Sequence, residues 1–231
     1  MSIRAPFPAT SQPIYGILGA VTTTLDGPEA PALVGRRHSR RFLFATMGIS
    51  AIFCLVASAV LSVESFHLAG NPEAVFGCDV NAALSCGAVA RAWQAQVLGF
   101  PNAFIGLATE PVVLTIAVAG FAGVRFPRWF MFAAQIGYLL GLVFAFWLFF
   151  QSMFVIGSLC PWCLTITVFT TVTFFTMLHI NVVENNLPLS RRGQEIALTL
   201  VRNNVDVYIP AVIIAAMAIG ILLKYGTIFF S

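Results

Sequence analysis

The segment Gly157-Ser158-Leu159-Cys160-Pro161-Trp162-Cys163 separates two apolar stretches, the second of which continues to Val183. Two thiols at the C-x-x-C spacing at a helix start close a small ring as a disulfide or open as a dithiol. Because a helix N-terminus favours negative charge, we expect Cys160 to form a thiolate readily, with a pKa in the range of roughly 3.5–7.5. The same spacing also makes half of a zinc site, so the surrounding sequence has to decide between the two.

The composition is that of a membrane protein. Of the 231 residues, 59% are hydrophobic and only 9% are charged, which excludes an ordinary soluble domain of this size. The net charge of +3 says little about binding partners, whereas the distribution of the charges along the chain says more.

Five apolar segments are candidates for transmembrane helices. They are Phe42–Val63, Asn102–Val124, Trp129–Ile156, Leu164–Val183 and the shorter Val207–Leu223. The first has 22 residues, or about 33 Å as a helix, which is enough to cross a bilayer. The sequence therefore predicts an all-α integral membrane protein with five spans.

The polar segments between these spans suggest how the chain is divided. Residues 1–41, rich in Pro, Thr, Ser and Gly, are predicted to be a disordered cytoplasmic tail, whose basic end at residues 36–41 anchors the topology rather than binding nucleic acid. Residues 64–101 are predicted to form an outer loop, with a short amphipathic helix over Cys86–Leu98 on the membrane surface. Residues 184–205 read as a cytoplasmic loop, and residues 206–231 as the fifth helix with a short outer tail.

The basic residues predict the orientation, because the cytoplasmic side carries an excess of Lys and Arg. With the N-terminus inside, the inner segments hold 10 of the 12 basic residues: Arg4, Arg36, Arg37, Arg40, Arg41, Arg125, Arg128, Arg191, Arg192 and Arg202. Only Arg91 and Lys224 fall outside. Both the loop cysteines, Cys78 and Cys86, and the C-x-x-C then face the outer compartment, where disulfides form and persist.

Four cysteines on one side of a bundle favour thiol–disulfide chemistry. In a relay, the loop pair exchanges with an outside protein and then with Cys160, and a lipid-soluble quinone is the natural final acceptor for a C-x-x-C at the edge of an apolar bundle. Two alternatives stay open. One is a structural zinc site with four thiolate ligands, although the Cys78/Cys86 spacing is wide for it. The other is a pair of static disulfides that brace a scaffold or a channel.

Two further residues are candidates for function. Glu110 is an intramembrane carboxylate, for which a structural polar contact and a proton-handling role are equally good interpretations. Cys54 lies alone within the first apolar segment, and we interpret it as a packing residue.

Three motifs resemble the vitamin K epoxide reductase family, including its bacterial, quinone-linked, disulfide-forming members. Residues 78–86 read C-D-V-N-A-A-L-S-C, similar to the family's C-D-V-x-x-A-[IL]-S-C, and residues 102–106 read N-A-F-I-G, similar to N-S-[IF]-[IF]-G. The CPWC at residues 160–163 is the third. Their order and spacing agree with the family over about residues 42–183.

The resemblance implies a fold and a set of roles. It implies a catalytic four-helix bundle over residues 42–183 around a quinone pocket near the outer face. Cys78 and Cys86 would be the shuttle pair, Cys86 would exchange with Cys160, and Cys163 would lie next to the quinone. Asn102 would donate a hydrogen bond to a quinone carbonyl, although it could instead be a cap of the second span.

The sequence departs from the family in two respects. The position of a vitamin-contacting tyrosine in vertebrate members is Thr167 here, one helical turn after Cys163, so Thr167 is expected to line the pocket while epoxide reduction becomes doubtful. Many bacterial members continue from a fifth span into a thioredoxin-like domain, but this sequence stops at Ser231, so a separate partner is expected.

We therefore predict a thiol oxidoreductase of the bacterial cytoplasmic membrane. It would pass electrons from a reduced extracytoplasmic thioredoxin-like or DsbA-like protein through the four cysteines to menaquinone or ubiquinone, with no resident metal. The alternatives are a quinone or vitamin K epoxide reductase that uses partner thiols, because reduction potentials set the direction, and a non-catalytic scaffold with structural disulfides.

Overall fold

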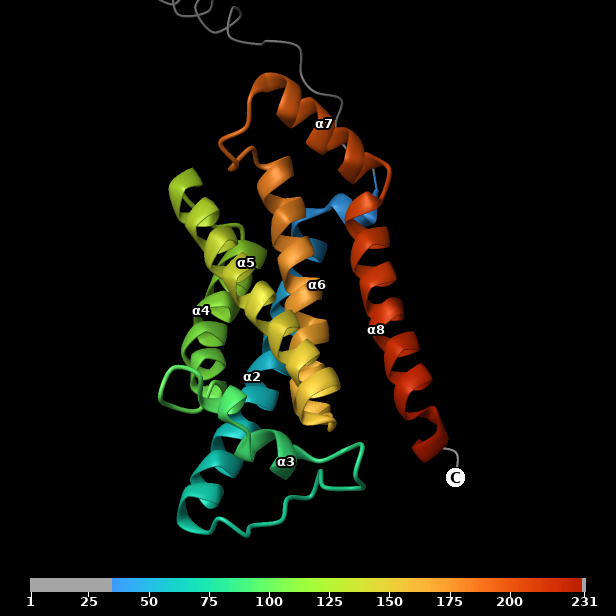
Figure 1. Ribbon diagram of the computed structural model, residues 1–231. Coiled ribbons are helices and arrows are strands. Elements are labelled where there is room, and N and C mark those ends of the chain that lie inside the picture. The colour runs from blue at the N-terminus through green and yellow to red at the C-terminus, as the bar shows by residue number, and fades with distance from the viewer. Residues whose placement is uncertain (1–34, 230–231) are drawn as a thin grey trace, which may run out of the picture. The chain divides into compact units, whose positions relative to one another are not determined.

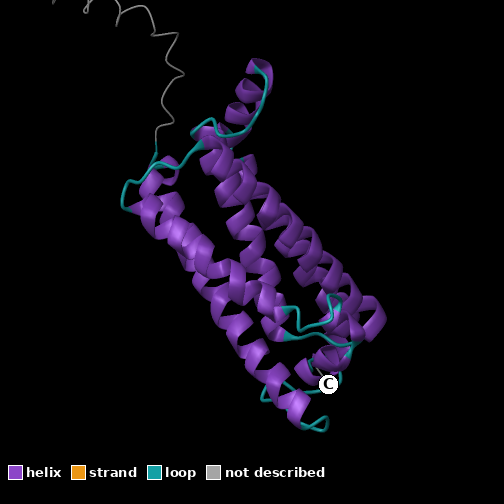
Figure 2. Ribbon diagram, turned by 90° about the vertical axis from the view of Figure 1, so that its left-hand side faces the viewer, coloured by secondary structure: helices purple, strands orange, loops and turns teal. Residues whose placement is uncertain are grey.

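The computed structural model describes residues 35–229, which form helices joined by loops and one isolated bridge (Figures 1 and 2). The long helices are α2 (Arg40–Gly70), α4 (Ala103–Phe121), α5 (Arg128–Phe150), α6 (Pro161–Val183) and α8 (Val205–Phe229). A π-helical segment, Gln151–Ile156, extends α5. All five are long and apolar enough to cross a membrane, which confirms the predicted all-α fold with five candidate spans.

Helix α2 is the central element of the bundle. It packs against α4 and α6, and α5 packs against α6. The main core forms where these helices meet, around the fully buried side chains of Phe44 and Met47 from α2, Met131 from α5 and Met177 from α6. Packing of this kind holds the helices at fixed positions, and the polar groups that line the space between them are fixed as a result.

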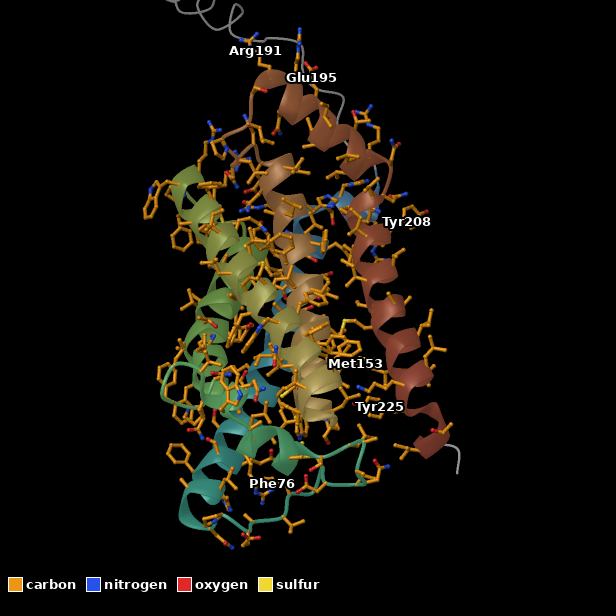
Figure 3. All side chains as sticks on the ribbon, viewed as in Figure 1. Phe76, Met153, Arg191, Glu195, Tyr208 and Tyr225 are labelled. Atoms are coloured by element: carbon orange, nitrogen blue, oxygen red, sulfur yellow. A yellow bond between two sulfur atoms is a disulfide. The ribbon has the colours of Figure 1, made fainter. Side chains whose placement is uncertain are left out.

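Helix α8 packs against α6 and is held at both of its ends. Near its start, Asp206 forms an ion pair with Arg37 at 2.7 Å and a hydrogen bond with His179 Nδ1 of α6 at 2.6 Å. Near its other end, Lys224 Nζ and the Tyr225 hydroxyl both donate to the carbonyl oxygen of Met153, and Figure 3 shows the two labelled side chains of Met153 and Tyr225 between α8 and the end of the π-helical segment. Polar contacts at both ends therefore fix the position of α8 against the rest of the bundle.

The first helix is longer than the apolar segment that predicted it. Residues 64–70 were expected in the outer loop, but they continue α2 as far as Gly70, where Asn71 and Pro72 follow. The prediction was wrong here because a charged residue such as Glu64 ends an apolar run without ending a helix; the helix ends only where the backbone of Asn71 becomes extended. The extra turns carry Glu64 beyond the apolar part of the bundle.

The other boundaries differ in smaller ways. Residues 184–205, expected as a loop, contain helix α7 (Arg191–Arg202), which begins at a cap where Ser190 Oγ accepts from Gly193 N. In Figure 1, α7 lies at the end of the bundle opposite α3 (Cys86–Arg91). The surface helix expected over Cys86–Leu98 is split into α3 and a 3-10 turn, Trp93–Gln96.

The basic end of the predicted tail is structured. Residues 36–38 form a 3-10 turn and α2 starts at Arg40, whose guanidinium pairs with Glu184 at 3.0 Å. The prediction of disorder therefore fails for residues 36–41, and for residues 1–34 it lies outside the described residues.

A close approach between α2 and α4 can be tested at Gly120. A Cβ atom at this position would overlap the ring of buried Phe44. We expect Gly120→Ala to lower the free energy of unfolding by about 1–3 kcal/mol, as overpacking does, although alanine is otherwise the better helix former. Thermal unfolding of the detergent-solubilised protein would measure this loss.

Gly226→Ala is the matched control for that measurement, because a Cβ atom at Gly226 meets nothing within 4 Å. An equal melting temperature for the two variants would contradict the close packing at Gly120.

Candidate active site

Asp79 organises the loop that carries the first cysteine pair. Its carboxylate accepts hydrogen bonds from Phe76 N at 2.8 Å, Gly87 N at 2.8 Å and Ser85 Oγ at 2.7 Å. Burial alone would raise the pKa of Asp79, but these hydrogen bonds and the nearby Arg91 hold that pKa below its ordinary value. One ionised side chain thus fixes the backbone on both sides of the Cys78/Cys86 pair.

Gly87 is needed for this arrangement. A Cβ atom at Gly87 would lie 2.9 Å from Asp79 Oδ2 and 2.6 Å from Arg91 Nη1, which is closer than either contact allows. Arg91 in turn donates to the carbonyl oxygens of Pro72 and Ala74, at 3.0 and 2.6 Å, and so ties α3 to the start of the loop.

A backbone pairing joins this loop to the segment that precedes the C-x-x-C. Leu84 and Leu159 form an isolated parallel bridge, in which Leu159 N donates to Ala83 O at 2.8 Å and Ser85 N donates to Leu159 O at 3.0 Å. Gly157, in the left-handed conformation with φ of 76°, turns the chain out of the π-helical segment and into this pairing. The two cysteine pairs, far apart in sequence, are brought together as a result.

The sulfur atoms lie in contact with one another. Cys78 and Cys86 form a disulfide, and Cys86 Sγ lies 3.4 Å from Cys160 Sγ. The disulfide uses two of the four thiolates that the alternative zinc site would need. Cys86 and Cys160 are each only 1% exposed, within an apolar cluster that includes Phe76 and Val89. Cys78 is half-buried, so that it is the more accessible sulfur of its pair.

Cys160 occupies the N-cap position of α6. Its sulfur accepts from Cys163 N at 3.4 Å. The hydrogen bond from the Cys163 thiol lowers the pKa of Cys160 most, and backbone N–H groups of Cys163 and Trp162 lower it further, against the opposing effect of burial. A sulfur with these donors is a good thiolate, either as an attacking group or as a leaving group.

A cavity of about 640 Å³ opens beside these sulfurs, with walls from α2, α4, α5 and α6. Cys86, Cys160, Cys163, Asn102, Thr167 and Glu110 all line it, and most of the remaining lining side chains are apolar. Its size is within the range of sites for small organic molecules. The structure thus brings every sequence-predicted site residue except Cys78 to one cavity, and Cys78 is bonded to Cys86.

Asn102 is the first residue of the N-A-F-I-G motif. It stands at the N-cap position of α4, but its side chain makes no capping hydrogen bond, so the capping interpretation is wrong. Instead Nδ2 donates to Gln94 O at 2.6 Å, while Oδ1 is buried without a hydrogen-bond partner among the described residues. Since Nδ2 carries two hydrogens, one remains for a molecule in the cavity.

Thr167 lies one turn beyond Cys163 and is 4% exposed. Its hydroxyl donates to Cys163 O at 2.9 Å, so it presents lone pairs rather than a proton to the cavity.

Glu110 lies deeper in the cavity wall and is 5% exposed. The Tyr138 hydroxyl of α5 donates to its carboxyl group, at 3.0 Å from Oε1 and 3.3 Å from Oε2. The structural polar contact therefore exists, and the carboxyl group also borders the cavity, so the two interpretations from the sequence are compatible.

Three residues of the site were not predicted. Gln94 is 3% exposed. Its backbone carbonyl oxygen accepts the hydrogen bond from Asn102 Nδ2, and its side-chain Nε2 donates to Gln151 Oε1 at 3.2 Å. No motif marks Gln94. The role of Asp79 had a signal, namely its place inside the C-D-V motif. Glu64, whose Oε1 lies 3.4 Å from Cys78 Sγ, was assigned to the loop because α2 was predicted too short.

The comparisons with known proteins agree with these motifs. The sequence model described as the Vitamin K epoxide reductase family matches residues 45–178, more than half of the chain and all four of the cysteines described above. No curated protein matches the chain.

The role of Asp79 in ordering the loop is testable. We expect Asp79→Ala to leave three donors without their acceptor and to reduce the hydrogen-exchange protection of residues 76–91 by about tenfold or more, given about 1–3 kcal/mol for each lost partner. Because the folded-state pKa of Asp79 is lowered, this protection is present above its ordinary pKa and is lost as the pH falls through the lowered value. Hydrogen-exchange mass spectrometry measures both effects.

Glu73→Ala serves as the control, because Glu73 is an exposed carboxyl group of the same loop. Equal protection in the two variants would show that the loop is ordered by other contacts.

Proposed function

The chain belongs to the vitamin K epoxide reductase family, whose members are quinone-dependent thiol–disulfide oxidoreductases, and on that premise we propose that it forms disulfides in a partner protein. Electrons pass from a reduced thioredoxin-like or DsbA-like partner to the Cys78–Cys86 pair, then to Cys160 and Cys163, and finally to a membrane quinone. The observation that carries the proposal is the 3.4 Å contact between Cys86 Sγ and Cys160 Sγ, because exchange between two pairs requires direct contact of one sulfur from each.

The exposure of the sulfurs supports the order of these steps. A partner in solution reaches half-buried Cys78 and not Cys86, which is 1% exposed. Attack at Cys78 releases Cys86, which already touches Cys160. Cys86 therefore passes electrons inward, and Cys78 serves the partner.

The cavity residues fit a quinone. A bound quinone supplies a two-electron acceptor that takes up two protons on reduction. The walls are mainly apolar, Cys163 borders the cavity, and Asn102 holds one N–H hydrogen that no described group receives. An amide donor fixed by Gln94 stabilises negative charge that develops on an oxygen atom at the cavity edge. Menaquinone and ubiquinone both meet these requirements.

The setting of the reaction follows from the charge distribution. We place the cysteine end of the bundle on the outer face of a bacterial cytoplasmic membrane, with the N-terminus in the cytoplasm, because the Arg-rich ends of α2, α5 and α7 lie at the other end. The outer compartment is where disulfides are made and kept.

The relay predicts the behaviour of cysteine variants. In a stopped-flow experiment with reduced thioredoxin and a quinone, we expect wild-type protein to consume quinone, and Cys160→Ala and Cys163→Ala to reduce the rate to background, because the electron path is cut at the last pair. Quinone absorbance reports the rate. Cys54→Ser is the control, since Cys54 is not one of the residues that line the cavity and lies behind Thr170 and Ile166, which it contacts.

Continued quinone reduction in Cys163→Ala would overturn the proposed path. Absence of quinone consumption by the wild type, with the disulfide resistant to mild reductant, would support a scaffold instead.

Asn102 provides a separate prediction. We expect Asn102→Ala to slow quinone reduction by about 100-fold, the usual effect of losing one donor to a developing oxyanion. Transfer of electrons from the partner to the cysteines should be unchanged, and acid-quench alkylation would measure it. Asn203→Ala, beyond the end of α7, is the control. A wild-type rate in Asn102→Ala would remove Asn102 from the reaction.

A further inference from the structure

Glu64 places a carboxyl group beside the outermost sulfur of the site. Its Oε1 atom lies 3.4 Å from Cys78 Sγ, and one of its oxygens, Cys78 Sγ and Cys86 Sγ all lie within 4.8 Å of one another. The elongation of α2 beyond the apolar segment is what brings Glu64 to this position. A disulfide sulfur has no proton to donate. Glu64 can therefore accept a proton from Cys78 only after the disulfide has opened and Cys78 is a thiol.

The surroundings of Glu64 leave it free to exchange a proton. Among the described residues it has no cationic partner, and its Oε2 atom is buried without a hydrogen-bond partner. The titratable groups that face it are Asp79, Cys78 and Cys86 from the loop, and Cys160 and Cys163 from the start of α6. All are acids.

The neighbouring carboxylate cannot play the same part. Asp79 already accepts three hydrogen bonds that hold the loop together. Glu64 has one oxygen without a hydrogen-bond partner, so it can take a proton from a thiol without losing a contact that holds the loop.

We propose that Glu64 is the general acid–base group of the Cys78 thiol, an inference that rests on the proposed relay. After Cys86 has attacked Cys160, those two sulfurs are joined in a mixed disulfide and Cys163 is released. The Cys78 thiol then attacks Cys86 and gives its proton to the Glu64 carboxylate. The Cys78–Cys86 bond forms, the Cys86–Cys160 bond breaks, and Cys160 leaves as a thiolate with both bonding electrons.

The product of this step is the arrangement in the structure. Cys78 and Cys86 are bonded, Cys160 Sγ lies 3.4 Å from Cys86 Sγ, and the Cys163 backbone N–H donates to the Cys160 sulfur. In this step Cys78 is oxidised and Cys160 is reduced, while Cys86 exchanges one disulfide bond for another, so no further oxidant is needed. In the reverse direction, protonated Glu64 gives its proton to Cys78 as Cys78 leaves.

The test is Glu64→Gln in the full-length protein, with reduced thioredoxin as the electron donor. Without the base, the attack depends on the fraction of Cys78 that is thiolate in water, about 3% at pH 7 for a thiol of ordinary pKa. We expect internal transfer to slow by about 30-fold at pH 7, and to recover by about tenfold per pH unit up to about pH 8.5. Wild-type protein should show a much flatter profile.

A second readout identifies the blocked step. Acid quenching, alkylation and mass spectrometry should reveal the Cys86–Cys160 disulfide accumulating in Glu64→Gln and not in wild-type protein. Glu73→Gln, which changes an exposed carboxyl group of the loop, should behave as wild type. Glu64→Asp should be slowed less than Glu64→Gln and keep the flat profile, which gives a second variant if Glu64→Gln does not fold.

The outcomes separate this inference from the proposed function. Wild-type protein that reduces no quinone would overturn the relay itself. An active wild type with Glu64→Gln equal to it at every pH would overturn only the role of Glu64. A Glu64→Gln variant that is slow at all pH values, without the mixed disulfide, would indicate structural damage and would overturn proton transfer as well.

Discussion

The backbone pairing between Leu84 and Leu159 is the constraint on which the active site depends. Two hydrogen bonds fix the loop segment alongside the segment before α6, and the cysteines that follow each segment, Cys86 and Cys160, are thereby set at contact distance. A loop of this length would otherwise sample many positions, and the entropy of ordering it would oppose the contact. The Asp79 hydrogen bonds offset part of that cost, because they hold the loop together from within.

The helix bundle makes a different contribution: its long helices form the walls of the apolar cavity that borders the cysteine sulfurs. Helix α2 touches α4 and α6, and the close approach at Gly120 lets Phe44 fill the space between them. Three polar side chains of the cavity wall are each held by a partner: Asn102 by Gln94, Thr167 by the Cys163 carbonyl, and Glu110 by Tyr138. In a membrane, an unpaired polar group is costly, so each such pairing also fixes the direction in which the side chain points.

The accuracy of the sequence predictions followed the strength of the physical signal. Long apolar runs predicted all five spans, since a run of about 20 apolar residues matches the thickness of a bilayer and seldom occurs in a soluble domain. Helix ends were less predictable. Glu64 suggested the end of a span, yet α2 continues to Gly70. The polar segment before the last span was predicted to be a loop, yet it contains α7. In both cases polarity suggests a loop, although charged residues form helices well.

The sequence by itself determined that this is a helical membrane protein with two cysteine pairs and the motifs of a quinone-linked family. Those properties depend on composition and on short spacings, which the chain displays directly. Only the tertiary structure decided which sulfur touches which, that Asn102 is held by Gln94, and that Glu64 lies against Cys78. These contacts join residues from different segments of the chain, and their distances depend on how the loop, α2 and α6 pack together.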